Sequence, residues 1–346
     1  MSDLTTTEAP DRPVQARRTV AITGASAGIG RATVRVFAQE GWRVGLIARD
    51  EERLERTAEE VRALGGEPIV CPADVADAEA IEAAADRIAE AGGGIDLWIN
   101  NAMTTVYGRV VDLTPREFAR VTEVVYLGAV YGTMAALKHM RAADAGTIVQ
   151  VGSALAHRAI PLQSAYCGAK YALRGFTDSL RAELEHEASP IRLSMVQLPG
   201  VNTPQFSWCR SKLPRRPEPV PPLFEPEAAA EAIRRAADEA PRELWVGGPS
   251  LQLIVGGAVA PGFMDKMLSE QAWSGQMTDE PQDGVYEGNL FEPVPGDYRA
   301  AGKFGDQARP DAVYVNPTTL RTAGLAAAGT LAVGALSLLL SGRRRA

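Results

Sequence analysis

The chain has 346 residues, 46% of them hydrophobic and 23% charged, proportions typical of a globular protein with a buried core. A net charge of −7 argues against a nucleic-acid-binding surface, and three scattered histidines argue against a histidine-rich metal site. Cys71, Cys167 and Cys209 have neither paired nor metal-ligating spacing, which favours a reducing, cytoplasmic compartment.

The first predicted strand follows a polar leader, residues 1–16, which lacks the apolar core of a secretory signal and which we expect to be disordered. Thr19–Thr23 is typical of a short buried strand, and it leads through a glycine-rich turn into a helical pattern. Backbone N–H groups at a helix N-terminus attract phosphate, and glycine lets the phosphate come close. The turn therefore predicts a phosphate site, with a ligand-free tight turn as the alternative. Its candidate cofactor-binding residues are Gly24, Ser26, Ala27, Gly28, Ile29 and Gly30.

The second predicted strand, Val44–Ala48, carries the signal for cofactor type. An acidic residue at this strand end binds the ribose hydroxyls of NAD, whereas a nearby arginine accommodates the 2′-phosphate of NADP. Ala48 occupies the acidic position and Arg49 follows it, which favours NADP and leaves NAD as the alternative. In the other interpretation, Arg49 is only a surface charge and Asp50 caps the next helix.

The remaining pattern alternates apolar runs with helical segments. We predict strands over 68–71, 95–100, 147–152, 191–197 and 243–246, and helices over 51–64, 76–91, 114–141, 162–186 and 225–239. Such alternation predicts an α/β fold: one doubly wound parallel sheet of the Rossmann type, with about seven strands and helices on both faces. Its ligands are expected beyond the carboxyl ends of the strands. We expect this catalytic domain to span residues 17–248.

Three polar side chains in the second half of that domain form a candidate catalytic group. Tyr166 and Lys170 are four residues apart, so a helix places them one turn apart on the same face. A lysine cation lowers the pKa of a neighbouring phenol from its usual value near 10, which suits it to acid–base catalysis. Ser153 follows a predicted strand and can hold the same substrate oxygen. The alternative is that Tyr-x-x-x-Lys occurs by chance and that Ser153 merely ends its strand.

Together, Thr23-Gly24-x-x-x-Gly28-Ile29-Gly30, Ser153 and Tyr166-x-x-x-Lys170 resemble the short-chain dehydrogenase/reductase family in its single-domain branch, over about residues 18–247. The resemblance implies an NAD(P)-dependent oxidoreductase that interconverts an alcohol and a carbonyl by hydride transfer, with Tyr166 as general acid and base. It also implies a homo-oligomer. The further positions that the resemblance assigns to the cofactor are Asp74 and Val75 at the adenine, Asn101 along the cofactor, Tyr166 and Lys170 at the nicotinamide ribose, and Val201 and Thr203 at the carboxamide.

Two residues depart from the family pattern. Met103 replaces the glycine of the Asn-Asn-Ala-Gly motif, so we expect a reshaped nicotinamide end. Val125 stands where the family carries an asparagine that steadies a water next to the lysine, and valine cannot form hydrogen bonds. These departures motivate a second hypothesis, a cofactor-binding sensor or scaffold with little turnover. A third, a sugar-nucleotide epimerase, shares Tyr-x-x-x-Lys but differs in glycine spacing and in its C-terminal domain.

The chain continues beyond the resemblance. Residues 205–226 correspond to the variable substrate lid of the family, and residues 249–320 predict an irregular C-terminal extension. Residues 321–346 contain an uncharged apolar run, 323–340, followed by Arg343–Arg345. A membrane anchor is one interpretation of this tail, and a dimerising helix or a disordered tail is the other. The apolar tail also makes a lipophilic small-molecule substrate a reasonable hypothesis.

Overall fold

The centre of the molecule is an eight-stranded sheet with the order β14-β11-β7-β6-β4-β1-β2-β3. A computed structural model of the protein describes residues 17–296 and 298–319. All strand pairs of this sheet are parallel except that between β11 and β14. The strands are β1 (Thr19–Thr23), β2 (Arg43–Ala48), β3 (Glu67–Pro72), β4 (Leu97–Asn100), β6 (Thr147–Val151), β7 (Arg192–Gln197), β11 (Glu243–Val246) and β14 (Tyr314–Val315). This confirms the predicted doubly wound parallel sheet.

The eighth strand is the one difference in the sheet from the sequence prediction of about seven. β14 comes from the C-terminal region and pairs antiparallel with β11, with Trp245 opposite Val315. It is only two residues long. Such a short strand carries no alternating pattern, so its place is decided by the edge of β11 rather than by its own sequence.

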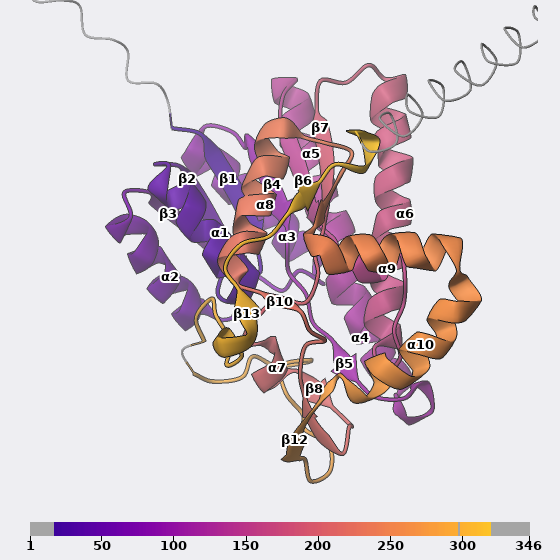
Figure 1. Ribbon diagram of the computed structural model, residues 1–346. Coiled ribbons are helices and arrows are strands. Elements are labelled where there is room, and N and C mark those ends of the chain that lie inside the picture. The colour runs from indigo at the N-terminus through magenta and orange to yellow at the C-terminus, as the bar shows by residue number, and fades with distance from the viewer. Residues whose placement is uncertain (1–16, 297, 320–346) are drawn as a thin grey trace, which may run out of the picture.

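Helices cover both faces of the sheet, as Figure 1 shows. Side chains along a strand alternate between the two faces, and β1 follows this rule: Val20 and Ile22 belong to one core cluster and Ala21 to the other. The first cluster contains residues of α1 (Gly28–Gln39), α2 (Glu51–Ala63) and α8 (Pro226–Glu239). The second contains residues of α3 (Ala78–Gly92), α5 (Gly128–Ala143) and α6 (Ser164–His186).

The helix predicted over 114–141 is interrupted. It consists of α4 (Pro115–Thr122), a π-helical turn over 123–127 and α5. Thr114 caps it through a capping box with Glu117, and Pro115 occupies the first turn, as the sequence indicates. The π turn contains Val125. Turns of this type are frequent at functional sites, because the extra residue redirects the side chains around it.

The C-terminal extension contains more regular structure than its composition indicates. Residues after β11 form α9 (Gly247–Val259) and α10 (Pro261–Ser274), where Pro261 opens the second helix instead of interrupting a strand or loop. Beyond α10, short strands pair with the lid region. The pairs join β9 (Arg215–Pro217) to β12 (Met277–Pro281) and β10 (Leu223–Phe224) to β13 (Ala308–Arg309).

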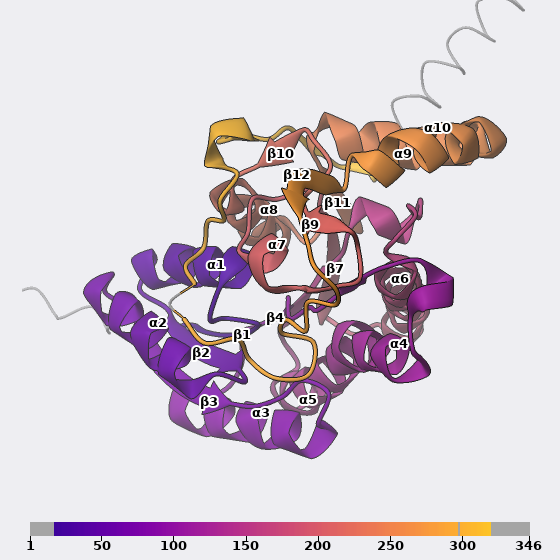
Figure 2. The same cartoon turned by 90° about the horizontal axis from the view of Figure 1, so that it is seen from below.

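The extension therefore folds back over the catalytic domain. In Figure 2 the orange segment that follows β12 crosses the side of the molecule on which β1 and β4 end. β5 (Val106–Tyr107) and β8 (Arg210–Ser211) form a further short pair beside it, next to the four-residue helix α7 (Gln205–Trp208). No helix within residues 17–296 and 298–319 has the length and apolar character needed to cross a bilayer. The expected leader, residues 1–16, and the tail, residues 321–346, lie outside the described residues.

Candidate active site

The three predicted catalytic residues lie together beyond the end of β6. Ser153 lies two residues after the strand, behind Gly152, and α6 carries Tyr166 and Lys170 one turn apart. The backbone N–H of Ser153 donates to Oε1 of Gln197 at 3.0 Å, and its hydroxyl accepts from the N–H of Leu155 at 3.1 Å. These two bonds fix the serine at the rim of the sheet. All three of these side chains line one cavity.

Burial sets the protonation of the tyrosine and the lysine. The Lys170 ammonium donates to the carbonyl oxygen of Val151 at 2.6 Å and lies 5.6 Å from the centre of the Tyr166 ring. Burial lowers the pKa of Lys170 to about 7, because the charged form is poorly solvated there. Burial also raises the pKa of Tyr166, and hydrogen bonding with Ser153 offsets only part of that rise. The direction is opposite to the lowering expected from Lys170, because desolvation by burial is the largest cause of the shift in the pKa of Tyr166.

The glycine-rich turn between β1 and α1 has the shape required to hold a phosphate. Gly24 has a φ of +68°, and a Cβ added at Gly30 would overlap the Gly24 carbonyl, so both positions require glycine. Ala27, the N-cap of α1, has no side-chain capping bond among the described residues. The N-terminus of α1 thus opens into a narrow groove of about 170 Å³, which Ser26, Ala27, Gly28 and Ile29 line.

Asn101 supports this turn from the neighbouring strand. Its side-chain amide donates to the carbonyl of Thr23 at 2.9 Å, and its backbone N–H donates to the Thr23 hydroxyl at 2.9 Å. Asn101 also lines the groove. The structure therefore gives the residue a clear role in shaping the turn, which the resemblance alone did not indicate.

Arg49, Asp74 and Val75 line the same groove, at the ends of β2 and β3. Asp74 accepts a hydrogen bond from the N–H of Ala76 at 3.0 Å and forms an ion pair with Arg120 of α4. Arg49 donates to two backbone carbonyls of the C-terminal extension, those of Phe291 at 2.6 Å and Asn289 at 2.8 Å. These bonds show that Arg49 is more than a free surface charge.

The two departures from the family pattern meet in one apolar cluster. Val125 is only 1% exposed and packs with Ala165 and Ala169 of α6, and the Tyr166 side chain and Met103 pack against the same cluster. Met103 also lines both the groove and the larger cavity beside it. Val125 thus makes apolar contacts next to Tyr166, where the family pattern predicted a polar side chain.

The larger cavity measures about 570 Å³ and continues from the groove, with Ile29, Asn101 and Thr203 lining both. Val201 lines the larger cavity and forms a β-bridge with Phe224. The two spaces together form an elongated site that passes the ends of β1, β4 and β6. The glycine-rich turn, the N-terminus of α1 and the elongated shape of the site together fit a dinucleotide. Among the described residues, no group of three or more His, Cys, Asp and Glu side chains is arranged to bind a metal ion.

The sequence analysis expected the lid, residues 205–226, at this cavity, but it missed the part of the wall that α9 and α10 contribute. Its apolar wall comes from the lid and from α9 and α10, which together contribute Phe206, Val220, Leu253, Met264, Met267 and Leu268. Met264, Met267, Leu268 and Gln271 follow the i, i+3, i+4, i+7 spacing of one helix face. That spacing was the available signal, but it predicts a buried helix face and says nothing about which site the face covers.

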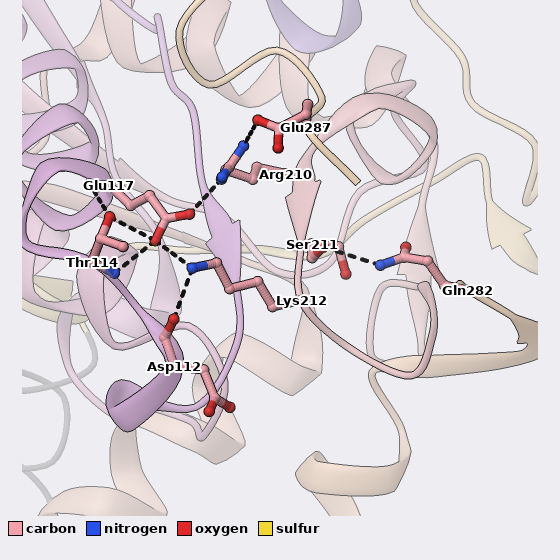
Figure 3. A network of polar contacts seen from close by, with 8 residues as sticks. All are labelled: Asp112, Thr114, Glu117, Arg210, Ser211, Lys212, Gln282 and Glu287. Carbon is pink, nitrogen blue, oxygen red and sulfur yellow. Dashed lines mark hydrogen bonds and ion pairs between the residues drawn. The ribbon is translucent and has the colours of Figure 1, made fainter. Parts of the chain in front are cut away.

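A buried ion network joins the lid to α4, as Figure 3 shows. The carboxylate of Glu117 accepts from Lys212 at 2.7 Å and from Arg210 at 2.5 Å, and Arg210 also pairs with Glu287 of the extension. Glu117 is 1% exposed, and its pKa falls to about 2. Burial alone would raise that pKa, so the bonds from Lys212, Thr114 and Arg210 outweigh desolvation. The network holds the lid and the extension against α4.

Comparisons with known proteins agree with this geometry. The uncharacterized oxidoreductase YxnA of Bacillus subtilis is 33% identical over 275 residues, covering 79% of this chain and 77% of its own. The uncharacterized oxidoreductase Rv1543 of Mycobacterium tuberculosis is 34% identical over 261 residues, covering 72% of each.

A solved structure shares the same fold. The alcohol dehydrogenase of the archaeon Thermococcus sibiricus, determined with 5-hydroxy-NADP, is 28% identical with a TM-score of 0.57 and covers 66% of this chain and 95% of its own. The sequence model of the short chain dehydrogenase family matches residues 18–213, which contain the glycine turn, Ser153, Tyr166 and Lys170. The chain belongs to the short-chain dehydrogenase/reductase family of oxidoreductases.

Proposed function

We propose that this oxidoreductase interconverts an alcohol and a carbonyl compound, with NADP as its preferred cofactor and with Ser153, Tyr166 and Lys170 as its catalytic residues. The observation that carries the proposal is the cavity of about 570 Å³: it brings these three side chains together and continues into the glycine-lined groove. The bound cofactor would supply or accept the hydride. The protein then has to orient the substrate and move one proton.

Each catalytic side chain has a role that its environment supports. The Ser153 hydroxyl, held at the end of β6, would bind the substrate oxygen. The raised pKa of Tyr166 keeps its phenol protonated at neutral pH, which is the form that donates a proton to a carbonyl oxygen. Lys170 has a pKa of about 7 and lies beside the Tyr166 ring. It would gain or lose a proton near neutral pH and would bind a ribose hydroxyl of the cofactor.

The cofactor would lie along the groove and enter the cavity with its nicotinamide end. Arg49 supports NADP, because its guanidinium has five N–H donors and only two are used in its bonds to Asn289 and Phe291. The proposed contacts with the rest of the cofactor are Asp74, Val75, Asn101, Val201 and Thr203. The NADP derivative in the Thermococcus sibiricus enzyme is a further support from a relative of this fold.

The substrate would be lipophilic. The cavity wall contributed by the lid, α9 and α10 is mostly aliphatic, thioether and aromatic. Such a wall favours apolar groups because their transfer from water is worth about 25 cal/mol per Å² buried. The proposed homo-oligomer and the proposed membrane contact through residues 323–340 remain separate predictions.

The test is the oxidation of NADPH and NADH by the purified protein with a panel of aldehydes, ketones and long-chain carbonyl compounds. We expect turnover with NADPH and its loss in Tyr166→Phe, while the variant keeps its affinity for NADPH. Tight NADPH binding with no turnover across the panel would instead support a cofactor-binding sensor, the function that the buried Val125 beside Tyr166 favours.

A further inference from the structure

The C-terminal extension contributes to the cofactor groove as well as to the substrate cavity. Asn289, Pro293 and Val294 line the groove together with Arg49 and Asp74. All three lie far beyond residue 213, where the match to the family model ends. This part of the groove is therefore built by residues specific to the extended chain.

The segment is held in place by backbone hydrogen bonds. The N–H of Asn289 donates to the carbonyl of Trp208 at 2.8 Å, and its own carbonyl accepts from Arg49 at 2.8 Å. The next carbonyl, that of Leu290, accepts from Arg120 at 3.2 Å, and the Leu290 side chain is fully buried. Farther along, the carbonyl of Val294 accepts from Arg53 at 2.6 Å. Because its N–H and its carbonyl are both bonded, the backbone of Asn289 is held in place beside the groove.

The side-chain carbonyl of Asn289 is the exception in this bonded segment. Its Oδ1 atom is buried and has no hydrogen-bond partner among the described residues. Leaving a buried acceptor unpaired is unfavourable, so an acceptor that lines a binding groove is best explained by a donor on the ligand. The groove at this point is formed by the ends of β2 and β3, where a dinucleotide of this fold places its adenosine half.

We propose that residues 289–294 form the outer wall of the adenosine site and that the Asn289 side-chain carbonyl accepts a hydrogen bond from the adenosine. The inference rests on the proposed function, since it requires a dinucleotide cofactor. The donor is the adenine amino group or a ribose hydroxyl. Asn289 is thus a binding residue for the cofactor and takes no part in the proton transfer at Tyr166.

Isothermal titration calorimetry of the full chain tests this proposal without any catalytic readout. The probes are NADPH, its adenosine half (adenosine 2′,5′-bisphosphate) and its other half (reduced nicotinamide mononucleotide). The variant is Asn289→Leu, which keeps the side-chain size and removes the acceptor. Asn316→Leu makes the same substitution away from the groove and serves as the control, with the melting temperature of each variant as the folding check.

We expect Asn289→Leu to bind NADPH and adenosine 2′,5′-bisphosphate about 2- to 12-fold more weakly than the unmodified protein, the value of one hydrogen bond. Binding of reduced nicotinamide mononucleotide should be unchanged, as should all binding by Asn316→Leu. Equal affinity of Asn289→Leu and the unmodified protein for NADPH overturns the inference but leaves the proposed function intact. An equal loss for both halves of the cofactor also overturns it, because it indicates a general disturbance. If the unmodified protein binds no dinucleotide, the proposed function itself fails.

A further arm needs no variant and identifies the donor. The hypoxanthine analogue of NADPH lacks the adenine amino group. If the unmodified protein binds it as weakly as Asn289→Leu binds NADPH, the donor is the amino group. If its affinity is unchanged while Asn289→Leu still weakens NADPH binding, the donor is a ribose hydroxyl.

Discussion

Arg49 donates a hydrogen bond of 2.6 Å to the carbonyl oxygen of Phe291, although 242 residues separate the two in the chain. The bond links the end of β2, where we propose that the NADP phosphate binds, to the C-terminal extension. Burial lowers the pKa of Arg49, but that value starts so high that the guanidinium stays charged at any physiological pH. Arg49 therefore has two tasks: holding the extension in place and presenting positive charge to the groove.

The double task of Arg49 predicts an unequal loss of cofactor affinity in Arg49→Leu. We expect NADPH to bind about 10- to 100-fold more weakly, because a charge-assisted bond to phosphate is lost. NADH affinity should fall less, since it reports only the loosened extension. Titration with each cofactor, followed by intrinsic fluorescence, measures the two losses of affinity. The control is Arg87→Leu, at an exposed position of α3. Equal losses for NADPH and NADH would contradict a role for Arg49 in phosphate binding.

The apolar cavity predicts that substrate length can be reduced by one substitution. Leu253 of α9 lines the cavity, and Leu253→Trp should lower kcat/KM for long-chain carbonyl substrates at least about tenfold. Short substrates should change about twofold or less, because they leave that region empty. The control is Val259→Trp on the same helix, where the side chain is 79% exposed. A uniform loss across chain lengths would mean that α9 does not border the substrate.

Buried Lys170 predicts a characteristic dependence of stability on pH. Its pKa is about 7 in the folded protein and near 10.5 in the unfolded chain, so the unfolded chain binds more protons between these values. Lys170 therefore lowers stability fully below pH 7, and this penalty is relieved as the pH rises from 7 towards 10.5. We expect Lys170→Met to raise the melting temperature at pH 6 and to lose most of that gain by pH 9.5.

Lys266→Met supplies the comparison, because Lys266 is exposed on α10 and outside the cavity. The same series of thermal scans from pH 6 to pH 9.5 should give no pH-dependent difference for this variant. If the rise in melting temperature of Lys170→Met stays constant from pH 6 to pH 9.5, Lys170 keeps an ordinary pKa in the folded protein.

The Glu117 network predicts acid-sensitive attachment of the lid. The pKa of Glu117 falls from 4.5 to about 2 on folding, so its contribution is complete above pH 4.5 and is lost as the pH falls towards 2. Glu117→Gln should lower the free energy of unfolding by about 3 kcal/mol at pH 7, because Arg210 and Lys212 lose their shared carboxylate. Urea unfolding at pH 7 and pH 3 measures the loss, which should be smaller at pH 3.

Glu287 offers the matched test within the same network. Glu287 lies in the extension and pairs with Arg210 of the lid, but its side chain is 77% exposed. Exposed ion pairs contribute about 1 kcal/mol or less, so Glu287→Gln should change the unfolding free energy by no more than that. Similar losses in both variants would indicate that the burial of Glu117 is not what makes the network stable.

The catalytic half of the molecule was predictable because its signals are local. Apolar runs such as Thr147–Val151 correspond to strands that are buried on both faces, and the glycine turn after β1 has a backbone geometry that few other residues allow. The four-residue interval between Tyr166 and Lys170 became one helical turn, as expected. The strand β14 and the helix α9 were missed because a two-residue strand and a glycine-containing helix have weak patterns. The helix α10 was missed although one of its faces has helical spacing.

The sequence by itself determined the family and the parallel sheet and predicted the candidate catalytic residues, since these depend on spacing along the chain and on backbone conformation. Tertiary structure alone decided the rest. The bonds from Arg49 reach the backbone carbonyls of Asn289 and Phe291, and because every residue has a carbonyl, no sequence pattern marks those partners. The pKa of Tyr166 followed the same logic: a rule based on its neighbour Lys170 predicted a lower value, but burial raises it. Desolvation depends on everything that surrounds a group, and only the folded chain brings that surrounding together.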